Sequence, residues 1–367
     1  MGKLSFLLGL TTVLLASLSC IVAIEITDIF TVQPGADDGG CDARAAVLDQ
    51  WLSEGIESLE VALAAIDDYY NDLRVQRSMD AIFGIKLPRG RSDKNVNRAI
   101  TEVRQNIQWV GDFYNRALDE YGNPTNDRAG FFLFCHSTFL SMLGEDDPAS
   151  DYEGNDILNE DGSKVRIKDI PEYAKELAKD PKAKPWWAGE LTDLNGYYFT
   201  EDGGNYCYTD ELGLTADIQL LRRGASGQAE VDNEIHSVIL CPYSFDGSPQ
   251  PNSYRDANKL LKENTNLADA VPKSATLLHE MFHALRGGFF LTGNDEKYTI
   301  AECINLPSKN AKINPENYVF FIAHMYHMRG KEESEEPWSI STNWDFAVQG
   351  PRSTRIFGAI ETEQVNT

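Results

Sequence analysis

The feature that most constrains this chain is the segment Leu278–His283, which reads LHEMFH. Two histidines four residues apart lie on the same face of an α-helix. Apolar residues surround them, among them Leu277, Phe282 and Leu285, so the helix must bury most of its surface in a core. Its polar face must then meet a cleft, because burying polar groups without partners is costly.

This polar face carries groups that can perform metal chemistry. His279 and His283 can offer two imidazole nitrogens to one metal ion. Glu280 lies one step round the helix, where it can take a proton from a metal-bound water and later pass it on. Zinc lowers the pKa of such a water to about 7. The pattern therefore predicts His279 and His283 as Zn²⁺ ligands and Glu280 as the general base and acid of a peptidase.

A catalytic zinc needs a third protein ligand and one open position. Two carboxylates compete for this role. Asp295 lies 12 residues after His283 in a glycine-bearing loop, and Glu302 lies 19 residues after it. Both distances are workable for a chain that leaves the helix at Gly287-Gly288 and turns back, so the spacing does not choose between them.

Apolar periodicity and turn residues predict the remaining elements. Helices are predicted over 43–74, 95–119, 170–181, 274–285 and 314–330. Strands are predicted over 131–140, which could also be buried helix, over the two arms of a hairpin at 195–209, and over 236–245. The sequence therefore favours an α+β fold.

The N-terminus predicts export. Lys3 precedes the uncharged run Leu4–Ala23, which has the pattern of a secretory signal peptide and is also long enough for an uncleaved anchor. We predict a secreted protein with one domain over 24–335, which carries an acidic insert near 144–232. The charged tail, 336–367, is predicted to be partly disordered.

The net charge of −24 restricts the partners. Such a surface repels nucleic acid and anionic lipid, so neither nucleic acid nor a membrane is an expected partner after signal removal. A protein or peptide substrate is the expected one. Removal of the signal peptide takes Cys20 and leaves five cysteines, for which secretion favours disulfides. Cys241 and Cys303 bracket the site helix, and we predict a disulfide between them.

The loop after the helix resembles a known family. TGNDEKYT, at 292–299, is similar to GTxDxxYG, the signature of the aspzincins, which include deuterolysin and peptidyl-Lys metalloendopeptidases. Asp295 and Tyr298 match, whereas the first two residues are transposed and Thr299 replaces a glycine. ILCPYSF before the helix and NPENYVFF after it also resemble secreted fungal members. The resemblance extends over about 41–330 and is strongest over 236–326.

The resemblance implies a zincin-like fold and a role for each matching residue. It implies that Asp295 is the third zinc ligand and that Tyr298 hydrogen-bonds the oxyanion of the transition state. Glu302 as the ligand would instead resemble a gluzincin. We expect the strand 236–242 to be a sheet edge that borders the cleft, where a substrate strand could add.

We therefore interpret the chain as a secreted zinc metalloendopeptidase. The rival hypothesis is a secreted zinc-binding or surface-interaction protein that keeps the fold without turnover. Glu280 favours the enzyme, since it supplies the base that a binding protein does not need.

Overall fold

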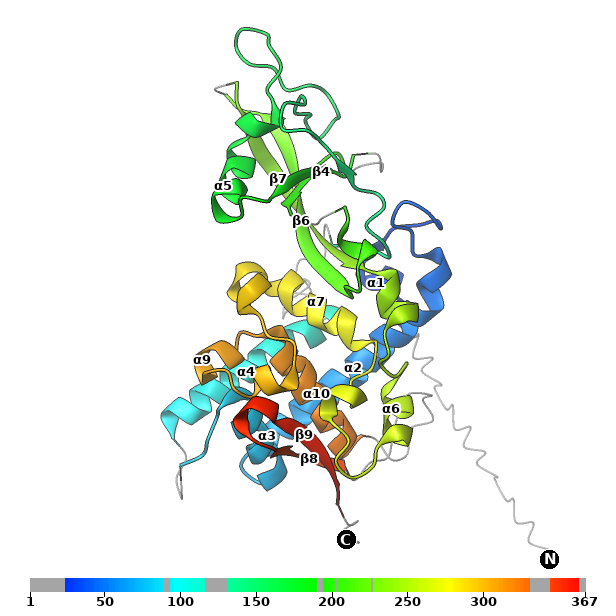
Figure 1. Ribbon diagram of the computed structural model, residues 1–367, viewed down its shortest axis with the longest axis vertical. Coiled ribbons are helices and arrows are strands. Elements are labelled where there is room, and N and C mark those ends of the chain that lie inside the picture. The colour runs from blue at the N-terminus through cyan, green and yellow to red at the C-terminus, as the bar shows by residue number, and fades with distance from the viewer. Residues whose placement is uncertain are drawn as a thin grey trace, which may run out of the picture.

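The computed structural model describes residues 24–88, 93–115, 131–189, 194–201, 204–225, 227–330 and 344–362. The predicted signal peptide lies outside these ranges. The described residues form an α+β fold with a mixed seven-stranded sheet. In Figure 1 the sheet occupies the upper part of the molecule, most helices lie in the lower part, and α7 (Ala275–Arg286) runs between the two.

Several helices follow the predicted ranges with shifted ends. The segment predicted as one helix over 43–74 is two, because Asp72 caps a new helix with its side chain on the amide of Arg74. The helix predicted from 95 begins at Lys94, and residues 116–119 lie outside the described ranges. The other helices are α1 (Ile26–Ile29), α2 (Ala45–Asp67), α3 (Leu73–Phe83), α4 (Lys94–Tyr114), α5 (Pro171–Lys179), α6 (Tyr254–Leu260), α8 (Ile300–Cys303), α9 (Ser308–Ala311) and α10 (Pro315–Arg329).

The large sheet has the strand order β1-β2-β7-β6-β5-β4-β3. β1, β2 and β7 are parallel, and the remaining neighbours are antiparallel. The strands are β1 (Thr31–Val32), β2 (Phe132–Phe134), β3 (Ser141–Met142), β4 (Lys184–Trp187), β5 (Tyr197–Thr200), β6 (Gly213–Arg223) and β7 (Ala229–Leu240). The long β6–β7 hairpin lies against α7 and connects the sheet to the helical layer.

Two strand predictions need correction. The strand at 236–242 is no edge, because Ser237–Ile239 of β7 pair with β2 on one side and with β6 on the other. The hairpin predicted over 195–209 does not form either. β5 pairs with β4 and β6, while Tyr206–Tyr208 form a short 3₁₀ turn, η3.

α10 is the centre of the helical layer. It packs against α2, α7 and α3 and is buried on all faces. His324 and His327 of this helix are therefore buried as well. His324 is satisfied by Ser78 and by Asp345, each at 2.9 Å, and His327 Nε2 lies 2.9 Å from the carbonyl of Ala270.

Asp345 belongs to the C-terminal part of the chain. β8 (Trp344–Gln349) and β9 (Ile356–Glu361) form an antiparallel hairpin that packs on α10 and α3. This hairpin lies within the tail for which the sequence predicted partial disorder. Buried Phe346 and Phe357 contribute to its attachment, since burial of apolar side chains stabilises the packed hairpin. No helix within the described ranges has both the length and the apolar character needed to cross a bilayer.

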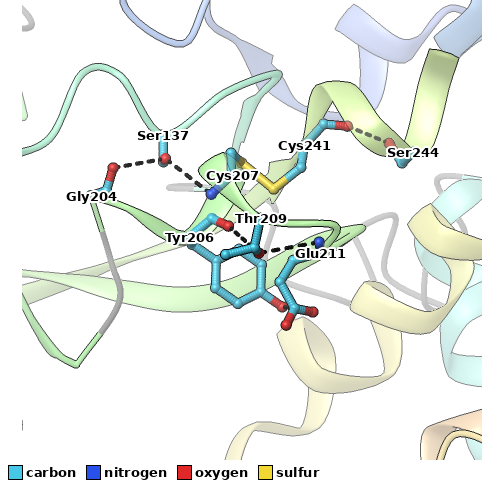
Figure 2. Close-up of a disulfide and its surroundings, with 8 residues drawn as sticks. All are labelled: Ser137, Gly204, Tyr206, Cys207, Thr209, Glu211, Cys241 and Ser244. Atoms are coloured by element: carbon cyan, nitrogen blue, oxygen red, sulfur yellow. Dashed lines mark hydrogen bonds between the residues drawn. A yellow bond between two sulfur atoms is a disulfide. The ribbon is translucent and has the colours of Figure 1, made fainter. Parts of the chain in front are cut away.

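The disulfide pairing differs from the prediction. Cys207 bonds to Cys241, and Cys41 bonds to Cys135. Cys303 is a buried free thiol, so the predicted Cys241–Cys303 bond is wrong. Cys241 directly follows β7, and there its side chain meets Cys207 in the neighbouring turn (Figure 2). Cys241 is therefore not available to Cys303.

A buried carboxylate on α2 holds the start of α7. Glu54 is fully buried and accepts hydrogen bonds from the hydroxyl of Ser274 and, at 2.6 Å, from the amide of Tyr254. Burial raises the pKa of Glu54 from 4.5 to about 7, and the two hydrogen bonds only partly oppose this shift. The folded protein therefore binds this proton more tightly than the unfolded chain does.

This difference predicts a pH-dependent stability. The stability should fall as the pH rises from about 4.5 to 7, with a contribution from Glu54 of about 3 kcal/mol. Urea unfolding at pH 5 and pH 8 should show that Glu54→Gln loses less stability over this interval than the wild type, because glutamine does not titrate. An equal loss in the two proteins would contradict this role of Glu54.

Candidate metal centre

The site helix α7 lies between the two layers of the fold. It packs against α2, α4 and α10 of the helical layer and against β6 and β7 of the sheet. The packing of buried apolar side chains holds α7 in the core; these are Leu277, Leu278, Met281 and Phe282. His279, Glu280 and His283 therefore project from a rigid element into the junction between sheet and helices.

Three side chains bring donor atoms to one point. His279 Nε2 lies 3.0 Å from Glu296 Oε1, and His283 Nε2 lies 3.3 Å from the same oxygen. One ligand atom from each of the three residues lies within 4.8 Å of the others. The structure thus joins the two predicted histidines with Glu296, which the sequence interpretation had not named.

The structure does not bring Asp295 to this point. Asp295 ends the 3₁₀ turn Gly293–Asp295 (η7) and is exposed, whereas Glu296 is only 5% exposed. The chain becomes extended at Glu296, so successive side chains point to opposite sides. Asn314 then fixes this orientation by bonding both the amide and the carbonyl of Lys297, at 2.9 and 2.8 Å.

Glu302, the other predicted carboxylate, has a structural role. It is exposed and forms a capping box with Thr299 at the start of α8, with 2.7 Å between Thr299 Oγ1 and Glu302 Oε2. A carboxylate that caps its own helix satisfies backbone donors there. Glu302 therefore lies outside the donor group.

A second carboxylate, that of Glu316, contacts the other ring nitrogen of His279. His279 Nδ1 lies 2.9 Å from Glu316 Oε2, at the first turn of α10. Because a carboxylate accepts the hydrogen, Nδ1 carries it and Nε2 is directed to the shared point. This is the carboxylate–histidine arrangement that orients metal ligands. The sequence offered a signal for it, since Glu316 belongs to the NPENY segment.

The charges within the group are strongly coupled. Burial lowers the pKa of His279, but hydrogen bonds with Glu296 and Glu316 outweigh burial and raise it to about 10. Burial raises the pKa of Glu296, yet hydrogen bonds with His279 and His283 lower it to about 2. The two carboxylates thus favour positive charge at this point, which a divalent cation can supply in place of the proton.

The donor set is compatible with a divalent cation such as zinc. Zinc bonds to histidine nitrogen and carboxylate oxygen at about 2.0–2.2 Å, so neighbouring donors of a tetrahedral site lie about 3.3 Å apart. The distances of 3.0 and 3.3 Å from Glu296 Oε1 to the two imidazoles are close to this value. Two histidines and one carboxylate also leave a coordination position for water or substrate.

Glu280 is held beside this group by β6. Its Oε2 accepts a hydrogen bond of 2.7 Å from the Thr215 hydroxyl. Its other oxygen lies against the backbone of Gly213, where a Cβ would approach Oε1 to 2.9 Å. A side chain at 213 would therefore displace the carboxylate, and glycine permits this close approach.

Tyr298 lies on the open side of the group. Its ring stacks on that of His279 with 5.8 Å between centroids, and the residue is 56% exposed. The structure therefore brings Tyr298 next to a predicted ligand while leaving it accessible to a bound molecule.

Comparisons with models of protein families, with curated proteins and with solved structures find no match to this chain.

The donor geometry predicts which carboxylate binds metal. Glu296→Gln should weaken Zn²⁺ binding, measured by calorimetry against a competing chelator, by at least about 100-fold, because it removes a charged ligand. Asp295→Asn and Glu302→Gln are matched controls and should leave the affinity within about threefold. A larger loss in Asp295→Asn than in Glu296→Gln would contradict this arrangement.

Proposed function

We propose that this protein is a zinc-dependent metalloendopeptidase of zincin type. The observation that carries the proposal is the convergence of His279, His283 and Glu296 on one point, with the Glu280 carboxylate beside it on the same helix. The resemblance of the loop and of the closing helix to aspzincins supports the same function, with Glu296 in place of Asp295 as the metal-binding carboxylate.

His279, His283 and Glu296 would hold the zinc ion. When bound, zinc acidifies a water molecule and polarises the carbonyl of a peptide. Glu316 keeps the His279 imidazole in the orientation that this ligation needs. The protein side of the site is thus prepared by contacts that belong to the fold itself.

Glu280 is the proton carrier of the proposed reaction. Thr215 occupies its Oε2, which leaves Oε1 to accept a proton from the attacking water. The same oxygen then returns the proton to the leaving amine. The Tyr298 hydroxyl can donate to the oxygen that gains negative charge in the transition state.

β6 offers an edge for the peptide. β5 pairs with β6 only at Gln219, so among the described strands none pairs with Gly213–Ile218 on that side. This edge begins beside Glu280, at Gly213 and Thr215. A peptide in extended conformation could add there through main-chain hydrogen bonds. This edge replaces the segment 236–242, which is paired on both sides.

We also propose that the protein is exported. Disulfides form and persist mainly in oxidising compartments, and the described residues form two. The apolar N-terminal run supports the same localisation.

The mechanism predicts the behaviour of Glu280→Gln. This variant should bind one equivalent of zinc but hydrolyse casein at least about 100-fold more slowly than the wild type, because an amide cannot accept the proton. Glu302→Gln serves as the control and should remain active. Full hydrolysis by Glu280→Gln would contradict the mechanism.

The zinc content of the same samples distinguishes the peptidase from the rival function, a zinc-binding protein without turnover. One equivalent of zinc in a wild type that cleaves no protein substrate, with or without chelator, would indicate a zinc-binding protein without turnover. Wild type without any zinc affinity would contradict both functions.

A further inference from the structure

The Cys207–Cys241 disulfide fixes a turn that shortly precedes β6. Cys207 lies in η3, and Cys241 follows the last residue of β7. Figure 2 shows the disulfide together with Tyr206, Glu211 and the hydrogen bonds of the turn. Tyr206 and Glu211 extend from it toward the yellow ribbon of α7, which packs against β6.

Hydrogen bonds make this turn a defined structure. The buried hydroxyl of Ser137 donates to the carbonyl of Gly204 at 3.1 Å and accepts from the amide of Cys207 at 3.4 Å. The hydroxyl of Thr209 donates to the carbonyl of Tyr206 at 3.0 Å. The amide of Cys241 donates to the carbonyl of Leu212 at 2.9 Å. The turn is thus bonded to the loop after β2, and the segment that leads from it into β6 is bonded to Cys241, directly after β7.

The Tyr206 side chain lies at the start of the β6 edge. Its hydroxyl donates to Glu211 Oε2 at 3.4 Å, and Gly213, two residues after Glu211, contacts the Glu280 carboxylate. Burial and the negative charges of Glu280 and Glu211 raise the pKa of Tyr206, and Tyr298 lies within electrostatic range as well. The phenol therefore lies within electrostatic range of Glu280 and stays protonated at neutral pH.

We propose that Tyr206 contacts the substrate of the peptidase, that its hydroxyl donates a hydrogen bond to a main-chain carbonyl of the bound peptide, and that the Cys207–Cys241 disulfide holds it there. This assignment rests on the proposed function. The hydrogen bond to Glu211 is long and Glu211 is exposed, so a peptide carbonyl can replace it at little cost. A peptide bound along Gly213–Ile218 would lie near the Tyr206 hydroxyl at the end of this edge that is close to Glu280.

The site would then have two phenols that come from different parts of the chain. Tyr298 comes from the loop after α7 and stacks on His279, whereas Tyr206 comes from the sheet side. Tyr208, in the same turn as Tyr206, is 68% exposed and contacts the ring of His136. It is therefore a matched control that carries the same functional group without facing the centre.

The test compares casein hydrolysis by zinc-loaded wild type, Tyr206→Phe and Tyr208→Phe. Tyr206→Phe should lower kcat/KM about tenfold, the upper end of the effect of one lost hydrogen bond, with unchanged zinc content and melting temperature. Tyr208→Phe should stay within about twofold of wild type. If the disulfide positions Tyr206, Tyr206→Phe should cost less than threefold in a Cys207→Ser/Cys241→Ser background, because the phenol is already displaced there.

The outcomes separate this proposal from the proposed function. An active wild type with an equally active Tyr206→Phe overturns the role of Tyr206 and leaves the peptidase intact. An undiminished effect of Tyr206→Phe in the double-serine background overturns the role of the disulfide. A wild type that binds zinc but cleaves no casein overturns the peptidase and, with it, the assignment of Tyr206.

Discussion

The hydrogen bond between His279 and Glu316 is the contact on which the candidate centre depends. It joins the site helix α7 to the first turn of α10, and α10 is the most buried helix of the fold. The same end of α10 also supplies Asn314, which fixes the strand-like segment that carries Glu296. The junction between α7 and α10 thus orients His279 and positions the Glu296 carboxylate. The spacing of His279 and His283 follows from the geometry of the α7 helix alone.

The sheet layer completes the site from the other side. Thr215 and Gly213 of β6 define where the Glu280 carboxylate lies, and the disulfide at Cys207 determines the neighbouring turn. The helical layer carries the candidate ligands, and β6 of the sheet layer positions the carboxylate of Glu280, the proposed proton carrier, and offers the proposed binding edge. A polar face that would destabilise a core is therefore accommodated at the boundary between the layers, where its groups find partners.

The sequence predicted what local periodicity determines. The helix around His279, Glu280 and His283 and the closing helix from Pro315 follow from the spacing of apolar residues and from turn residues at their ends. Glu296 could not be distinguished from Asp295, because the choice depends on the 3₁₀ turn that ends one residue earlier. The pairing of Cys241 and the two-sided pairing of β7 depend on the sheet order, which joins segments about 100 residues apart and has no local signal.

The proposed function depends on the binding of one zinc ion by the two imidazoles of α7 and the Glu296 carboxylate. Anomalous diffraction at the zinc edge, from crystals of the zinc-loaded protein, tests this binding. One peak is expected within about 2.0–2.2 Å of His279 Nε2, His283 Nε2 and a Glu296 oxygen. A peak coordinated by Asp295 or Glu302 in place of Glu296, or zinc bound elsewhere with these three side chains free, would contradict it.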